Sequence, residues 1–120
     1  NAFYDWNILL NKEGGPNHVG NYCDAPFLYD EERKELLQRM SADYYWHFAH
    51  FIKPGAVRLG FSRYTDEIDV TVWENPDGRI VLILLNRGEE AVPVQIRISG
   101  KEAEILLSAH GIASGVISDE

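Results

Sequence analysis

The sequence predicts a mainly β chain with some α-helix, in which an antiparallel β-sandwich follows a shorter region of mixed structure. Three observations support this fold class. From Val57 onward apolar residues alternate with polar ones, which is the period of a half-buried strand. Turn-forming residues separate about six such segments, and one segment before Val57 has a helical period instead. The 120 residues leave room for one modest core.

The first segment, Phe3–Leu10, is rich in aromatic and branched residues and predicts a short strand. It ends at a dense set of turn formers, residues 11–17, and the following loop runs to Pro26. Asn, Gly, His and aromatic residues are unusually frequent in this loop. That composition suits a binding loop better than a plain connection.

Residues 31–40 are rich in Glu, Arg, Lys, Leu and Gln, which are good helix formers. Propensity alone therefore favours a helix over Glu31–Met40. Ser41 is then the expected N-cap of a firmer helix, whose apolar stripe is Tyr45, Phe48, Ala49 and Ile52 and whose end is Pro54-Gly55.

The second half of the chain predicts the strands of the sandwich. Ile80–Leu85 is a continuous apolar run that should be buried on both faces, and residues 75–78 form a turn before it. Pro93 indicates an edge strand or a bulge. The period of two places eight side chains on the inner face: Ile68, Val70, Val72, Leu82, Leu84, Val94, Ile96 and Leu107.

Charge and cysteine content exclude several function classes. The formal net charge is −8, which argues against nucleic acid or an anionic membrane surface as a partner. Cys23 is the single cysteine, so the fold is held without an intrachain disulfide. No apolar run approaches the roughly 20 residues that cross a bilayer, and the N-terminus lacks the layout of a signal peptide.

Residues 6–26 carry a specific resemblance. They contain Trp-Asn, Leu-Asn, Glu-Gly-Gly-Pro-Asn and then Asn-Tyr and Asp-Ala-Pro. This series resembles glucosylceramidase-like enzymes, family 30 of the glycoside hydrolases, from the last strand of their (β/α)8 barrel into its loop. His47-Phe48 and Phe51–Ala56 resemble the family's final barrel helix, while Asn75–Gly78 and Leu85-Asn86-Arg87 resemble its side sandwich.

The resemblance implies a domain organisation and a hairpin. Residues 1–55 correspond to the final β/α unit of a catalytic barrel, which is incomplete, and residues 56–120 to a C-terminal β-sandwich. The apolar segment begins at Phe3 without a lead-in, so we expect that sequence precedes Asn1 in the gene. The family usually has a hairpin where propensity favours a helix, which implies that Asp30–Lys34 is a charged turn and Leu36–Met40 the returning strand. We adopt the hairpin over the helix.

The resemblance also implies what the chain contributes to catalysis. The family's two catalytic glutamates lie on earlier barrel strands, so no catalytic residue is expected here, and a retaining mechanism needs two carboxyl groups about 5 Å apart. Glu13 is expected to face solvent or order its loop. The fragment alone is predicted to be inactive, whereas its parent hydrolyses a β-linked glycoside.

Three residues are the candidate substrate-binding site: Trp6, Asn21 and Tyr22. Trp6 is expected at the carboxyl end of a barrel strand, where its indole face can pack on a pyranose. From spacing alone it fits a core aromatic as well, and Asn21 beside Gly20 fits a turn. The resemblance places all three in the family's sugar pocket.

Neither a metal site nor a cofactor is predicted. His47 and His50 are three residues apart, but no third ligand is evident, so a packed or surface pair is the better interpretation. Cys23 lacks a catalytic signature and is expected to be a small buried residue.

Two other function classes stay open. One is a free-standing carbohydrate-binding sandwich with Trp73 in an exposed platform, and the other is a structural or interaction module. The excised fragment would leave sheet edges and apolar faces without partners, so we expect it to self-associate as a dimer. Its carbohydrate partner would be the substrate of the full-length parent.

Overall fold

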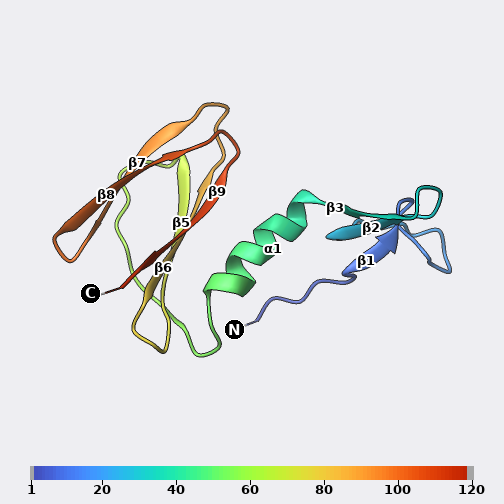
Figure 1. The fold of residues 1–120 in the computed structure, drawn as a ribbon, viewed down its shortest axis with the longest axis horizontal. Helices are drawn as coiled ribbons and strands as arrows, with labels where there is room; N and C mark the ends of the chain where they lie inside the picture. The colour runs from blue at the N-terminus through green and yellow to red at the C-terminus, as the bar shows by residue number, and fades with distance from the viewer. Residues whose placement is uncertain (1, 119–120) are drawn as a thin grey trace. The chain divides into compact units, whose positions relative to one another are not determined.

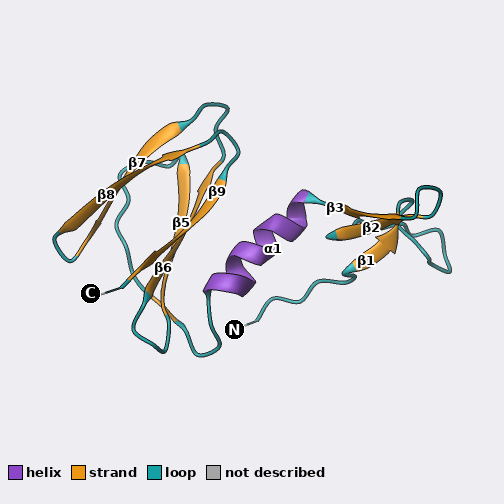
Figure 2. Ribbon diagram, in the orientation of Figure 1, coloured by secondary structure: helices purple, strands orange, loops and turns teal. Residues whose placement is uncertain are grey.

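The computed structural model describes residues 2–118; Asn1, Asp119 and Glu120, at the outer ends of the two predicted domain ranges, lie outside them. The described residues form nine strands and one helix (Figures 1 and 2). In chain order these are β1 (Leu9–Asn11), β2 (Phe27–Asp30), β3 (Glu35–Gln38), α1 (Met40–Phe51), β4 (Val57–Arg58), β5 (Ile68–Glu74), β6 (Ile80–Asn86), β7 (Val92–Ile98), β8 (Lys101–Leu107) and β9 (Ile112–Ile117). The predicted class, mainly β with one helix and a β-sandwich, is confirmed.

The chain forms two compact units that divide between Trp46 and His47. The first unit contains a three-stranded sheet in the order β1-β2-β3, with β1 parallel and β3 antiparallel to β2. Its small core consists of Leu10, Ala25 and Leu28, and Cys23 packs against them. Cys23 was expected to be a small buried residue; it packs against this core but is only half-buried.

The hairpin interpretation of residues 30–40 is confirmed, and the helix favoured by propensity is absent. β2 and β3 pair with Leu28 opposite Leu37, so the returning strand is Glu35–Gln38 and not Leu36–Met40. Asp30 orders the turn because its Oδ1 accepts bonds from the amides of Glu32 and Arg33, at 3.0 and 3.2 Å. The Arg33 amide is the main cause that lowers the pKa of Asp30.

The strand predicted over Phe3–Leu10 is present only from Leu9. β1 pairs with β2 alone, and within residues 2–118 no strand lies beside residues 3–7. A strand is defined by its hydrogen-bonded neighbour, so aromatic and branched residues without one remain irregular. Phe3, Tyr4 and Ile8 are accordingly exposed.

The helix departs from two predictions. It begins at Met40, and the Ala42 amide donates to the Arg39 carbonyl at 2.9 Å, so Ser41 lies inside the helix and is not its N-cap. The predicted apolar stripe is not buried: Phe48 is 41% exposed. Ala42 is the buried residue of α1. Among the described residues, no helix is long and apolar enough to cross a membrane.

The second unit is the predicted sandwich. One layer is an antiparallel sheet in the order β4-β5-β6-β9, and the other is the β7-β8 hairpin (Figure 1). Pro93 lies on β7, which pairs with β8 alone among the described strands, so its predicted edge position is confirmed. Six strands after Val57 match the predicted number.

The inner face of the sandwich follows the predicted period of two. Ile68, Leu84 and Leu107 form the buried centre, and Val70, Val94 and Ile96 pack against it. Val72 and Leu82 are buried as well and lie opposite each other on β5 and β6. β6 is buried on both faces, as its continuous apolar sequence indicates.

Two buried asparagines hold the connections of this unit. Asn75 follows β5: its Nδ2 donates to the Phe51 carbonyl, and its Oδ1 accepts from the Lys53 amide, both at 2.9 Å. This contact satisfies backbone groups at the end of α1. Asn86 ends β6 and is completely buried.

Candidate functional site

The three predicted substrate-binding residues all lie in the first unit. Trp6 precedes the amino end of β1, and Asn21 and Tyr22 lie in the loop between β1 and β2. All three are exposed, Trp6 at 85% and Tyr22 at 64%. Trp6 is therefore not at the carboxyl end of a strand that the structure describes, and its side chain lies outside the small core of this unit. Among residues 2–118, no hydrogen bond or ring contact joins the three side chains to one another.

The first part of the loop is a tight turn organised by Asn11. The side-chain Oδ1 of Asn11 accepts a hydrogen bond from the Gly15 backbone amide at 2.7 Å, and the Asn11 backbone amide donates one to the Gly15 carbonyl at 2.7 Å. The Gly14 amide also donates to the Asn11 carbonyl, at 2.9 Å. The Leu-Asn and Glu-Gly-Gly-Pro pattern of the sequence thus forms a turn at the end of β1. Glu13 is exposed in this turn, as expected of a solvent-facing carboxylate.

The second part of the loop is attached to that turn through Gly14. The Cys23 amide donates to the Gly14 carbonyl at 3.0 Å. Gly14 has φ +87°, and a Cβ at this position would lie 2.3 Å from the Cys23 carbonyl oxygen. Only glycine permits this approach. Because Asn21 and Tyr22 immediately precede Cys23, this contact anchors the segment that presents them.

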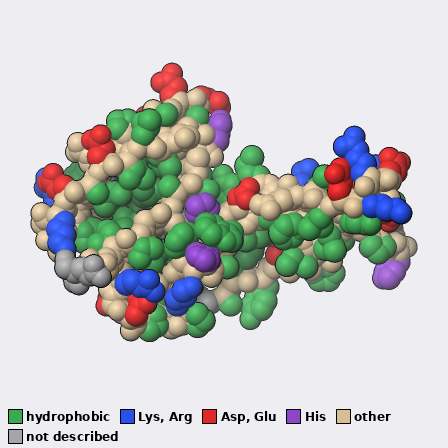
Figure 3. All heavy atoms as spheres, in the orientation of Figure 1, with side chains coloured by type: hydrophobic (Ala, Val, Ile, Leu, Met, Phe, Trp, Pro, Cys, Tyr) green, Lys and Arg blue, Asp and Glu red, His purple; other side chains and the backbone are tan. Residues whose placement is uncertain are grey.

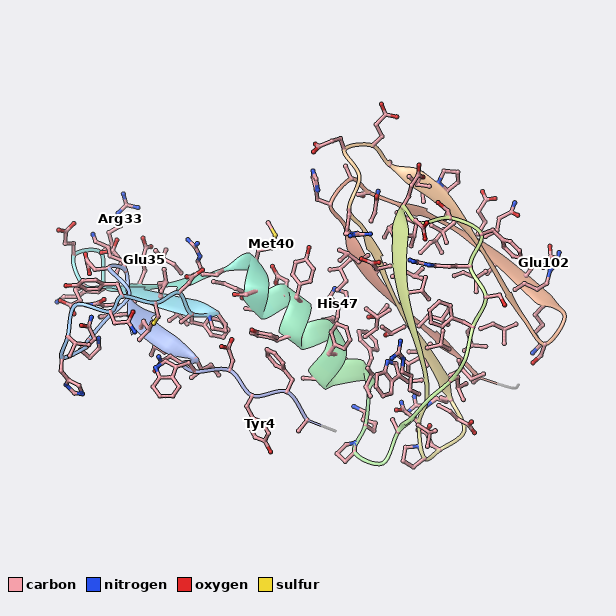
Figure 4. The ribbon with its side chains drawn as sticks, turned by 180° about the vertical axis from the view of Figure 1, so that it is seen from behind. Tyr4, Arg33, Glu35, Met40, His47 and Glu102 are labelled. Atoms are coloured by element: carbon pink, nitrogen blue, oxygen red, sulfur yellow. The ribbon has the colours of Figure 1, made fainter. Side chains whose placement is uncertain are left out.

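The segment around Trp6 is held by a residue that the sequence did not single out. Asp5 accepts two hydrogen bonds: its Oδ1 accepts one from the Trp6 backbone amide at 2.7 Å, and its Oδ2 accepts one from the Tyr45 hydroxyl. The hydrogen bond from Tyr45 is the main cause that lowers the pKa of Asp5, and the bond from the Trp6 amide adds to it. The hydrogen bond to Asp5 raises the pKa of Tyr45. Figure 4 shows Tyr4, in the same segment, pointing away from the ribbon. Asp5 and Tyr45 are 40 positions apart, so no local pattern could reveal the pair.

His47, His50 and His110 make packing or hydrogen-bonding contacts. His47 Nδ1 lies 2.8 Å from Ser114 Oγ (Figure 4), and the His50 ring meets Phe51 edge-on at 4.9 Å. His110 Nε2 lies 3.0 Å from Glu89. Within the described range, no group of three or more His, Cys, Asp or Glu side chains is placed to hold a metal ion.

The second unit has a shallow hollow of about 460 Å3 that includes none of the predicted site residues. Its lining comprises Asp66, Glu67 and the connection from Asn86 to Val92. Trp73 does not form an exposed platform: it is half-buried, and its indole Nε1 donates to Thr71 Oγ1 at 2.9 Å. No observation in this unit therefore favours a free-standing carbohydrate-binding sandwich.

Comparison with family models decides the classification. Residues 55–115 match the beta sandwich domain of glycosyl hydrolase family 30, which is half of the chain. The chain belongs to glycosyl hydrolase family 30. Residues 1–53 match the TIM-barrel domain of the same family. The resemblance of the loop, helix and sandwich segments to this family is thereby confirmed.

Curated relatives of this family 30 chain include glucosylceramidases. It is 37% identical over 94 residues to the lysosomal acid glucosylceramidase of Mus musculus, a match that covers 77% of the chain and 18% of the relative. The putative glucosylceramidase 1 of Caenorhabditis elegans is 39% identical over 84 residues, covering 68% of the chain and 16% of that protein. The chain therefore spans less than a fifth of the length of these relatives.

Solved structures show the same fold. SrfJ from Salmonella typhimurium superimposes with a TM-score of 0.92 at 35% identity, over 97% of this chain and 26% of SrfJ. The endo-beta1,6-glucanase BT3312 superimposes with a TM-score of 0.81 at 24% identity, over 91% of this chain and 25% of that chain. The second comparison supports the fold alone.

Proposed function

We propose that this chain is the C-terminal part of a retaining glycoside hydrolase that cleaves a β-linked glycoside. The observation that carries the proposal is the consecutive match to the TIM-barrel and sandwich domains of family 30, together with the glucosylceramidase relatives. On this basis residues 1–55 are the final β/α unit of the catalytic barrel, and residues 56–120 are the sandwich that braces it.

Trp6, Asn21 and Tyr22 are the proposed substrate-binding residues. An exposed indole offers a large flat apolar surface, which packs well on the C–H face of a pyranose. A side-chain amide and a phenol can both donate and accept hydrogen bonds with sugar hydroxyls. The high exposure of Trp6 and Tyr22, and the turn that anchors the Asn21 segment, support this role.

The two catalytic carboxylates belong to other parts of the parent enzyme. A retaining mechanism requires one carboxyl group that protonates the leaving oxygen and a second, about 5 Å away, that forms the glycosyl-enzyme intermediate. Glu13, the carboxylate of the candidate loop, is exposed, and the sequence around it does not indicate a second catalytic carboxyl group. The chain supplies substrate contacts and support, and no proton transfer.

We expect the full-length hydrolase to release aryl alcohol from an aryl β-glycoside, and the 120-residue chain to release none. Both proteins are assayed with β-glucoside, β-xyloside and β-fucoside substrates. Hydrolysis by the chain alone, abolished by Glu13→Gln, would show that the chain holds its own catalytic group. A full-length protein that is folded yet inactive on every β-glycoside would contradict the proposed activity.

We further propose that the isolated chain forms a dimer. Phe3, Tyr4 and Ile8 are exposed, and hydrophobic side chains lie at the surface (Figure 3). β3, which includes the exposed Leu36, is an edge strand of its sheet among residues 2–118. Unpaired edges and apolar patches favour association, and the net charge of −8 opposes open-ended growth. Light scattering over a range of protein and salt concentrations should give twice 13.7 kDa. A mass that stays at the monomer value at high concentration contradicts the dimer.

A further inference from the structure

The backbone of Trp6 is anchored on both sides, although its side chain is 85% exposed. Within residues 2–118 no strand pairs with residues 3–7, so other contacts must order this segment. On one side of Trp6, Asp5 accepts two hydrogen bonds. On the other side, the Ile8 carbonyl accepts from the Phe27 amide of β2 at 3.1 Å. Trp6 thus lies between two fixed points.

The anchor on the amino side is a carboxylate bridge. One oxygen of Asp5 binds the amide of Trp6 itself, and the other binds the hydroxyl of Tyr45 on α1. The ring of Phe3 also lies against Tyr45, with centroids 5.7 Å apart. Both hydrogen bonds lower the pKa of Asp5, so the carboxylate is ionised at neutral pH and the bonds are charge-assisted.

The bridge fixes the backbone from which the indole of Trp6 projects. Among the described residues the ring is 85% exposed, so its direction follows that backbone. Stacking on a sugar requires the indole plane to meet the pyranose face squarely, and a ring that must first be ordered binds more weakly.

We infer that Asp5 and Tyr45 are positioning residues that fix Trp6 for stacking on the substrate sugar. The inference rests on the proposed binding role of Trp6. Tyr45 touches no sugar in this scheme; it acts through Asp5 and the Trp6 amide. The consequence is that removal of the Tyr45 hydroxyl matters only while the indole of Trp6 is present.

A double-mutant cycle in the full-length hydrolase tests this dependence. Trp6→Ala should lower kcat/KM about 10- to 100-fold through lost stacking. Tyr45→Phe, which keeps the ring and removes the hydroxyl, should lower kcat/KM about 3- to 10-fold. The double variant should be no worse than Trp6→Ala alone, because the bridge then has nothing to position.

Tyr44→Phe is the matched control, because it removes a hydroxyl from the adjacent half-buried tyrosine of α1 and should leave kcat/KM unchanged. Thermal midpoints establish that each variant is folded. If Tyr45→Phe does not fold, Asp5→Asn and Asp5→Ala are measured in its place. The side-chain amide of asparagine keeps an acceptor oxygen, so Asp5→Asn should lower kcat/KM less than Asp5→Ala does.

The outcomes separate the two proposals. Losses from Trp6→Ala and Tyr45→Phe that multiply in the double variant mean that Tyr45 supports the fold generally, which overturns the positioning role and leaves the pocket role of Trp6 intact. A folded, active enzyme that is unaffected by Trp6→Ala overturns the pocket role and the positioning inference together, while its glycosidase activity still stands.

Discussion

Asn86→Leu is expected to lower the free energy of unfolding of the sandwich by about 3–5 kcal/mol. The Asn86 side chain is completely buried. Its Nδ2 donates to the Glu90 and Ser108 carbonyls at 2.7 and 3.0 Å, and its Oδ1 accepts from the Gly88 amide at 2.8 Å. Leucine fills a similar volume, so the effect comes from the loss of the hydrogen bonds that the Asn86 side chain makes to the backbone of the two connections.

Amide hydrogen exchange along β6 measures this change within the second unit. Gln95→Leu is the control, because it removes an amide from an exposed strand position and should change the free energy by less than about 0.5 kcal/mol. Equal effects of the two substitutions would show that Asn86 does not hold the connections between β6 and β7 and between β8 and β9.

The sandwich was predictable because each of its strands is specified by local signals. Alternation placed Ile68, Val70 and Val94 on the inner face, and the unbroken apolar run of Ile80–Leu85 indicated a strand covered on both sides. The part played by Asn86 was not predictable in this way. The sequence shows a polar residue at the end of an apolar strand, but its partners lie as far as 22 positions away.

The first unit was less predictable because its structure depends on contacts that are remote in sequence. The Phe3–Leu10 pattern indicates a strand, yet only Leu9 and the two residues after it have a neighbour to pair with. The helical stripe through Phe48 was correct in period, but burial also requires a covering surface. Trp6, Asn21 and Tyr22 were named through a family resemblance, and their role in binding remains a prediction.

Gly14→Ala is expected to open the candidate loop. Gly14 adopts φ +87°, a conformation that costs a residue with a Cβ about 1–2 kcal/mol. The added Cβ would also lie 2.3 Å from the Cys23 carbonyl oxygen, so the backbone at Gly14 or Cys23 must shift. Such a shift breaks the 3.0 Å bond from the Cys23 amide to the Gly14 carbonyl, which anchors the segment carrying Asn21 and Tyr22.

The reactivity of Cys23 reports this opening in the 120-residue chain, because Cys23 is its single cysteine and is half-buried. A thiol reagent should modify Gly14→Ala at least about tenfold faster than the unchanged chain, since modification of a packed thiol requires local opening. Gly20→Ala separates the two causes: Gly20 has φ +71°, but no atom lies within 4 Å of its added Cβ. That variant carries the conformational cost without the collision, so its rate should stay within about threefold of the unchanged chain. If Gly14→Ala reacts no faster than Gly20→Ala, the close approach of Gly14 to Cys23 does not hold the loop, and the segment of Asn21 and Tyr22 must be ordered by other contacts.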